Sequence, residues 1–273
     1  MVCFRRCHLA EGEQGPCLAR RNQGGRIVCA NYGAVTSLAL DPIEKKPLAR
    51  FFPGSRILSL GSFGCNLFCP FCQNHEIAHP GEQVEFRRMH PEEICELAED
   101  LKEKGNIGAA FTYNEPLVGW EFVRDTAKLI HEAGMKNVLV TNGTAGLSVL
   151  EALKPYIDAM NIDLKSIRPE YYSDYLRGDL PMVKRFIEEA ASFCHVELTT
   201  LILPGKNDSE EEMCSLSRWI AGLRGGEGRE IPLHISRYFP RYREELPPTP
   251  VKTIYRLKEA AEEELRYVFT GNC

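Results

Sequence analysis

Residues 57–72 read Ile57-Leu-Ser-Leu-Gly-Ser-Phe-Gly-Cys65-Asn-Leu-Phe-Cys69-Pro-Phe-Cys72. A short apolar run, typical of a buried strand, leads directly into a loop whose three cysteines are spaced C-x3-C-x2-C. Three thiolates within eight residues can ligate three irons of a [4Fe–4S] cube, which leaves the fourth iron free to bind a group that is not protein. This stretch therefore predicts a metal site with an open coordination position at the end of a strand.

A structural zinc ion is the alternative for the same loop. The three cysteines and His75 form the pattern C-x3-C-x2-C-x2-H, and thiolate and imidazole are the ligands that tetrahedral zinc takes. Structural zinc sites usually gather their ligands in two pairs separated by a longer loop, whereas here four ligands would be crowded into eleven residues. The iron–sulfur interpretation is therefore favoured, and zinc stays open as the second hypothesis.

The overall composition is that of an ordinary soluble globular protein. The chain has 273 residues, enough for one α/β domain, of which 44% are hydrophobic and 26% are charged. Its net charge of −5 argues against a dominant nucleic-acid surface. No apolar run approaches the ~18–20 residues that span a bilayer, and no signal-peptide core stands at the N-terminus, so we expect a cytoplasmic protein without a membrane partner. In a reducing compartment, eleven cysteines indicate metal binding rather than disulfides.

From residue 56 onward the sequence alternates between strand and helix patterns. The candidate strands, most of them continuous apolar runs, are 56–61, 108–113, 137–142, 158–164, 196–203 and 231–236. The candidate helices, with apolar residues on one face, are 91–104, 117–133, 182–193, 209–223 and 250–265. Six such repeats predict an α/β fold, a partial (β/α)6 barrel of parallel strands with right-handed crossovers, over residues 53–273. Residues 1–52 contain extended stretches and Cys3, Cys7 and Cys17, and we expect them to form an N-terminal segment that packs on this core.

Polar motifs gather at the carboxyl ends of the candidate strands. They are Cys65–Cys72, Asn114-Glu115-Pro116, Thr141-Asn142-Gly143, Asp163-Leu-Lys165, Pro204-Gly205 and His234. The carboxyl ends of barrel strands form the face that carries the chemistry of such folds. We therefore expect these motifs to build one site.

The cysteine spacing, with aromatic Phe71 before the last cysteine, resembles the CxxxCxφC signature of radical S-adenosylmethionine (SAM) enzymes. The resemblance implies that Cys65, Cys69 and Cys72 ligate a [4Fe–4S] cluster and that SAM binds the open iron through its amino and carboxylate groups. It also places Phe71 near the SAM adenine, which a flat apolar face can contact. A core phenylalanine under the loop is the other interpretation of Phe71.

Thr112-Tyr113-Asn114-Glu115-Pro116 stands at the position of the Gly-Gly-Glu motif of this family, with Tyr113-Asn114 in place of the two glycines. In the family that motif holds the SAM ammonium group, and a carboxylate accepts a strong hydrogen bond from such a cation. The resemblance thus assigns Glu115 to the SAM ammonium. The alternative is that Glu115 is a carboxylate at the N-terminus of the next helix.

Two further segments are similar to those of pyruvate formate-lyase activating enzymes. In those enzymes a Thr-Asn-Gly and an Asp-Leu-Lys segment line the SAM carboxylate and ribose beside a monovalent cation, and a histidine on the sixth strand contacts SAM. The residues that this resemblance assigns here are Thr141, Asn142, Asp163, Lys165 and His234. The alternatives are an ordinary strand-end ion pair for Asp163 and Lys165 and a core position for His234.

A closer resemblance covers nearly the whole chain. Its motifs include Gly15-Pro-Cys17-Leu-Ala-Arg20, Phe52-Pro-Gly54-Ser and Pro232-Leu-His-Ile-Ser-Arg237-Tyr-Phe-Pro240, which resemble the AmmeMemoRadiSam-system radical SAM enzymes. The resemblance implies reductive cleavage of SAM to methionine and a 5′-deoxyadenosyl radical, with an external one-electron reductant of flavodoxin or ferredoxin type.

The substrate cannot be read from these motifs, and three hypotheses stay open. The first is an activase that places a glycyl radical on a partner protein, and the second is an enzyme that modifies a small molecule or peptide. The third, from another class, is a non-catalytic zinc- or iron–sulfur-binding protein.

Overall fold

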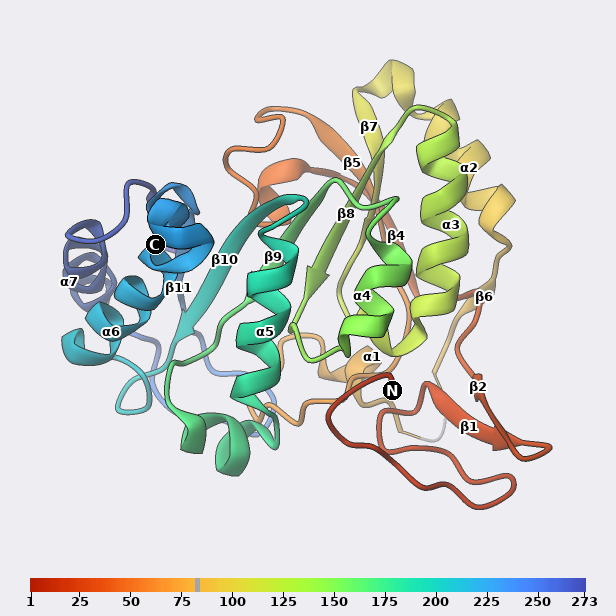
Figure 1. Cartoon of the computed structure of the whole chain (residues 1–273), viewed down its shortest axis with the longest axis horizontal. Helices are drawn as coiled ribbons and strands as arrows, with labels where there is room; N and C mark the ends of the chain where they lie inside the picture. Colours follow the sequence, from red (N-terminus) through yellow and green to blue (C-terminus); the bar gives the residue numbers. More distant parts are fainter. Residues whose placement is uncertain (82–83) are drawn as a thin grey trace.

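A mostly parallel β-sheet runs through the centre of the molecule (Figure 1). The computed structural model describes residues 1–81 and 84–273. Over these residues the main sheet has eight strands in the order β12-β11-β10-β9-β8-β7-β5-β4. Its members are β4 (Ser37–Pro42), β5 (Arg56–Gly61), β7 (Asn106–Phe111), β8 (Lys136–Thr141), β9 (Ala159–Asp163), β10 (His195–Ile202), β11 (Leu233–Arg237) and β12 (Val268–Gly271). Neighbouring strands are parallel from β5 to β12, and β4 is antiparallel to β5.

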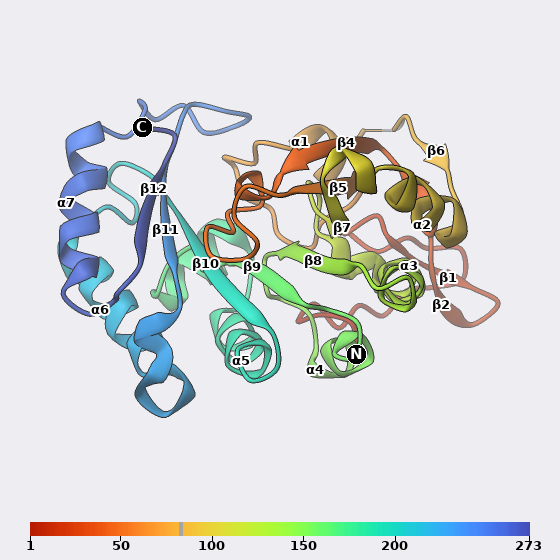
Figure 2. The same ribbon diagram turned by 90° about the horizontal axis from the view of Figure 1, so that it is seen from above.

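The sheet is curved into a partial barrel whose two edges are β4 and β12 (Figure 2). The longer helices cover its convex side: α2 (Pro91–Asp100), α3 (Trp120–Glu132), α4 (Leu147–Leu153), α5 (Leu180–Ala190), α6 (Glu210–Ala221) and α7 (Val251–Glu262). The segment after β4, drawn in orange, lies on the concave side. The predicted α/β architecture with a partial barrel is therefore confirmed.

Local sequence explains where several helices begin. α2 has Pro91 at its first position, and the Glu93 carboxylate accepts the His90 backbone N–H at 2.7 Å. α5 begins after Asp179, whose carboxylate accepts the Met182 N–H at 2.7 Å. These side chains satisfy N–H groups that would otherwise lack a partner in the first turn.

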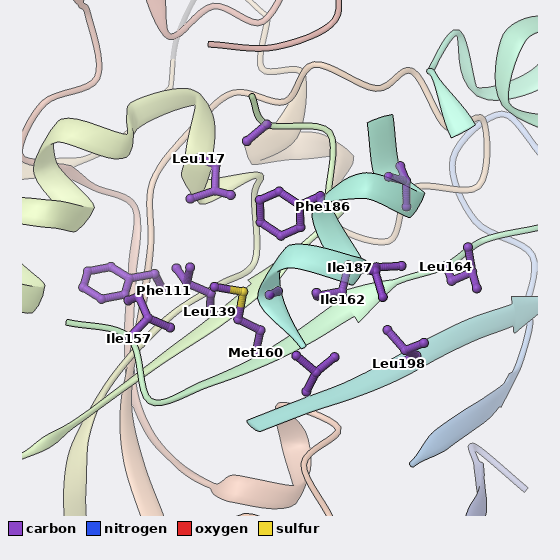
Figure 3. Packing of buried hydrophobic residues seen from close by; sticks show 14 of the residues in the cluster. Phe111, Leu117, Leu139, Ile157, Met160, Ile162, Leu164, Phe186, Ile187 and Leu198 are labelled. Atoms are coloured by element: carbon purple, nitrogen blue, oxygen red, sulfur yellow. The ribbon is translucent and has the colours of Figure 1, made fainter. Parts of the chain in front are cut away.

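The main core lies between the sheet and the helices on its convex side. Leu139 of β8, Met160 of β9 and Phe186 of α5 have no exposed surface. Figure 3 shows Phe186 and Ile187 facing Ile162 of β9. Complete burial of a side chain of this size contributes about 1.5–3 kcal/mol, so the continuous apolar runs of the strands hold the barrel wall together.

The N-terminal segment (residues 1–52) joins the barrel at several places. β1 (Arg20–Gln23) and β2 (Arg26–Cys29) form a hairpin, and β3 (Ala34–Val35) pairs with β6 (Arg87–Arg88), while β4 extends the main sheet. On the concave side Ile43, Leu48 and Phe51 pack against residues of the barrel strands. The segment therefore fills one end of the concave side.

The described helices are too short or too polar to cross a lipid bilayer.

Candidate active site

A cavity of about 700 Å³ lies on the concave side of the sheet. The loop after β5, residues 62–74, forms one wall and is called the cysteine loop here. The predicted site residues that line the cavity are Cys69, Phe71, Cys72, Asp163, Lys165 and His234. Further lining comes from residues 44–49 of the N-terminal segment and from residues 269–272. The polar ends of β9 and β11 thus face the cysteine loop across one space.

The cysteine loop is held in a conformation that buries its thiols. Gly64 has φ +98°, and a Cβ at this position would collide with the Cys17 carbonyl oxygen, so only glycine fits. Burial raises the pKa of the Cys65 and Cys72 thiols and raises that of Cys69 to about 12. Protonated thiols are thus favoured until a metal displaces the protons, since metal coordination deprotonates a thiol outright.

Two N–H groups donate hydrogen bonds to the Cys65 sulfur. The Leu67 backbone N–H donates to Cys65 Sγ at 3.4 Å, and the Asn142 side-chain amide donates to it at 3.7 Å. Lys165 adds a positive charge that lowers the thiol pKa of Cys69 and Cys72 against the effect of burial. N–H groups that hydrogen-bond to sulfur tune iron–sulfur clusters, so the surroundings of these thiols fit such a group.

The structure does not bring the four predicted zinc ligands together. Among the described residues no three His, Cys, Asp or Glu side chains are gathered closely enough to hold one metal ion. His75, the fourth zinc ligand in that alternative, stacks on Tyr242 with ring centroids 4.4 Å apart.

Asp163 and Lys165 form an ion pair at the edge of the cavity. Lys165 Nζ lies 2.8 Å from Asp163 Oδ2. Burial alone would lower the pKa of Lys165, but the Asp163 carboxylate outweighs burial, and the pKa is raised. The strand-end ion pair that the sequence left as an alternative is thus present, and both side chains line the cavity.

Phe71 and His234 lie on two sides of the same cavity. Phe71 is 5% exposed and lies 5.8 Å from the Tyr175 ring, measured between centroids. The ring of His234 stacks on Phe269 of β12 at 5.2 Å. Each ring is therefore packed from one side and available to a ligand from the other.

Glu197 of β10 fixes His234 and was not predicted from the sequence. Its carboxylate lies 2.6 Å from His234 Nε2 and 2.9 Å from His195 Nε2, and it accepts the backbone N–H groups of Ala49 and Arg50. Burial would raise the pKa of Glu197, yet these hydrogen bonds lower it to about 2. A glutamate within the apolar run of β10 was the one signal in the sequence that pointed to this residue.

Glu115, Thr141 and Asn142 form a buried network behind the cavity rather than part of its lining. Glu115 Oε1 accepts from Leu117 N at 3.0 Å and from Thr141 Oγ1 at 2.7 Å, and Oε2 accepts from Asn142 N at 2.7 Å. Burial raises the pKa of Glu115 to about 7 despite these bonds. Glu115 caps the turn Pro116–Gly119 that precedes α3, as the capping alternative expects. The network reaches Cys65 through the Asn142 amide.

Tyr113 keeps a glycine-like backbone at the position where the family motif has glycine. Its φ is +73°, in the left-handed region that favours glycine. The phenol donates to Asp41 at 2.7 Å, and Lys46, which pairs with Asp41 at 2.9 Å, lies 4.6 Å from the centre of the ring. The buried Asp41–Lys46 ion pair of the N-terminal segment therefore holds Tyr113, with its strained backbone, two residues before Glu115.

Comparison with known proteins identifies the family. The model of the Radical SAM superfamily matches residues 60–217, which include the cysteine loop and the strands β7 to β10. An uncharacterized protein of Methanocaldococcus jannaschii is 40% identical over 275 residues, which cover 99% of this chain and 80% of that protein. The GTP 3′,8-cyclase of Pseudomonas syringae is 30% identical over 54% of this chain and 45% of its own length. The match to the cyclase thus spans less than half of that enzyme.

Solved structures show the same fold at low sequence identity. A domain of pyruvate-formate lyase-activating enzyme from Bacteroides vulgatus matches 60% of this chain and 99% of its own, with a TM-score of 0.52 and 17% identity. Streptococcus suis SuiB bound to S-adenosylmethionine matches 80% of this chain and 52% of its own, with a TM-score of 0.61 and 15% identity. With the family match, these results show that the chain belongs to the radical SAM superfamily.

Proposed function

We propose that the protein cleaves SAM reductively at a [4Fe–4S] cluster held by Cys65, Cys69 and Cys72, and that the resulting radical takes a hydrogen atom from a substrate. The observation that carries the proposal is the cavity in which the cysteine loop faces the polar ends of β9 and β11. Its volume of about 700 Å³ lies within the range of about 300–1,000 Å³ usual for small-molecule sites. Family membership supports the same chemistry.

The bound cluster supplies the electron that breaks the C5′–S bond of SAM, giving methionine and a 5′-deoxyadenosyl radical. The chain binds and orients the reactants. The Leu67 N–H and the Asn142 amide hold Cys65 Sγ in place. Phe71 offers a flat face to the adenine.

We assign the polar contacts to SAM from the residues at the cavity edge. Asp163 would accept hydrogen bonds from the ribose hydroxyls, and Lys165 would bind the SAM carboxylate. His234, whose ring is hydrogen-bonded to Glu197, would contact the nucleoside part. Lys165 supplies a positive charge 2.8 Å from Asp163, and a monovalent cation beside this pair stays a prediction of the family resemblance.

The Glu115 network has a supporting role in this proposal. With Thr141 and Asn142, Glu115 positions the loop that holds Cys65. Its Oε2 accepts one hydrogen bond from the chain and has one acceptor position left. Because Glu115 lies behind the cavity lining, its contact with the SAM ammonium stays a prediction of the family resemblance.

The electron comes from an external one-electron donor of flavodoxin or ferredoxin type in the cytoplasm. The substrate is a small molecule, a peptide or a partner protein. The fold match to an activating-enzyme domain supports the alternative in which a partner protein receives a glycyl radical. A non-catalytic metal-binding role predicts no turnover of SAM.

The test is anaerobic reconstitution with iron and sulfide, followed by dithionite and SAM, with 5′-deoxyadenosine quantified by mass spectrometry. We expect 5′-deoxyadenosine from the wild type and none from Cys72→Ala. Cys95→Ala, which changes a half-buried cysteine on α2 away from the cavity, is the matched control and should leave product formation unchanged. Stoichiometric zinc with no 5′-deoxyadenosine would overturn the proposal.

A further inference from the structure

A second cavity, of about 310 Å³, is lined by residues of the N-terminal segment and by Val118. Three cysteines line it: Cys3, Cys7 and Cys17. All three are free thiols. The cavity therefore brings together three thiols that are spread over fifteen residues of the sequence.

Arg20 provides an independent sign that a ligand belongs in this cavity. It lines the cavity and is only 7% exposed. Its two terminal nitrogens bind Glu121 at 2.6 and 2.7 Å, while Nε has no hydrogen-bond partner in the part of the chain that the structure describes. A buried N–H without an acceptor costs free energy. A bound group with sulfur acceptors would satisfy it.

The backbone next to two of these cysteines is strained. Arg6 and Leu18, next to Cys7 and Cys17, have φ values of 46° and 62°, which non-glycine residues rarely adopt. Strain of this kind persists only where the surrounding structure imposes it.

The cavity is also rich in positive charge. Arg5, Arg6 and Arg20 line it together with the three thiols. These arginines would offset the negative charge of thiolates that bind metal.

We propose that Cys3, Cys7 and Cys17 bind a second iron–sulfur cluster, with Arg20 Nε donating a hydrogen bond to one of its sulfur atoms. Two contacts join the residues around this site to the cysteine loop. Arg5 Nε donates to the Asn66 carbonyl at 2.7 Å, and the Cys17 carbonyl contacts Gly64. Figure 1 shows the N-terminus beside α4, where Gly146 N donates to the Val2 carbonyl at 2.8 Å.

The test counts iron and sulfide in the full chain after anaerobic reconstitution. We expect about eight irons per wild-type chain and about four in the Cys65→Ser/Cys69→Ser/Cys72→Ser variant. Adding Cys7→Ser to that variant should remove the remaining iron. Cys7 is exposed, so this single change leaves the packing around buried Cys17 intact. The matched control Cys95→Ser/Cys214→Ser should keep about eight irons.

Spectroscopy separates this proposal from the proposed function. The reduced Cys65→Ser/Cys69→Ser/Cys72→Ser variant should show a cluster electron-paramagnetic-resonance signal that does not change with SAM. About four irons in the wild type, all lost with Cys65, Cys69 and Cys72, would overturn the second site. One zinc ion per chain that Cys7→Ser removes would also overturn it. Eight irons without 5′-deoxyadenosine would instead leave the second cluster in place and refute the radical chemistry.

Discussion

Replacing Glu197 with glutamine tests whether one buried carboxylate ties His234 to the N-terminal segment. Glu197 has no exposed surface, and its two oxygens accept four hydrogen bonds, from two imidazoles and from the Ala49 and Arg50 N–H groups. These bonds outweigh burial and hold the pKa at about 2, against an ordinary 4.5. One pKa unit is worth about 1.4 kcal/mol, so a difference of about 2.5 units corresponds to about 3 kcal/mol of folding free energy.

The effect of Glu197→Gln should depend on pH in a defined direction. Because the folded pKa lies below the ordinary value, the carboxylate stabilises the fold fully above pH 4.5, and this contribution is lost as the pH falls toward about 2. We expect the variant to be about 3 kcal/mol less stable than the wild type at neutral pH and about 1.5 kcal/mol less stable near pH ~3.

Urea unfolding at pH ~7, ~5 and ~3 measures these differences. Glu188→Gln, on an exposed position of α5, is the matched control and should change stability by less than about 0.5 kcal/mol at each pH. A difference between wild type and Glu197→Gln that stays constant from neutral pH to pH ~3 would refute the reasoning. So would a difference below about 1 kcal/mol at neutral pH.

Three further substitutions probe the site. Tyr113→Phe removes the hydrogen bond to the Asp41 carboxylate and should lower the free energy of unfolding by about 1.5–3 kcal/mol in urea; an unchanged midpoint would show that the phenol does not support the loop. Lys165→Met leaves Asp163 without its partner and should weaken SAM binding in equilibrium dialysis about tenfold or more, with iron content unchanged; wild-type affinity would remove Lys165 from the SAM site. Glu115→Gln places an amide N–H₂ opposite the N–H donors that Glu115 accepts, so it should destabilise the fold by about 1–3 kcal/mol without loss of iron. Calorimetry and an iron assay measure the two effects, and wild-type stability would contradict a structural role for the Glu115 hydrogen bonds.

Apolar runs were enough to predict the barrel wall. The six predicted strands are confirmed as β5 and β7 to β11, because strands buried on both faces leave continuous apolar runs in the sequence. α4 and β12 were missed. α4 has seven residues and β12 has four, too few to show a clear period. β12 nevertheless carries Phe269, which packs on His234.

The site was predictable only where motifs follow directly after strands. The sequence placed Cys69, Phe71, Cys72, Asp163, Lys165 and His234 on one face, and they line one cavity. Glu197 and the Asp41–Lys46 pair were missed because the site residues that they support, His234 and Tyr113, are distant from them in sequence. The register between neighbouring strands decides which residues lie side by side and which face points into the cavity. In the structure Thr199 of β10 is the register partner of His234 of β11, and this pairing cannot be read from either strand alone.

The N-terminal segment supports the site through buried polar groups rather than through apolar packing alone. It supplies the backbone donors for Glu197, the Asp41–Lys46 pair that holds Tyr113, and the Cys17 carbonyl against Gly64. A buried charge that loses its partner costs more free energy than an apolar contact that is lost. Each of these contacts reaches a different part of the site: the His234 side, the Glu115 loop and the cysteine loop. The geometry of the cavity therefore depends on the N-terminal segment as directly as on the barrel strands.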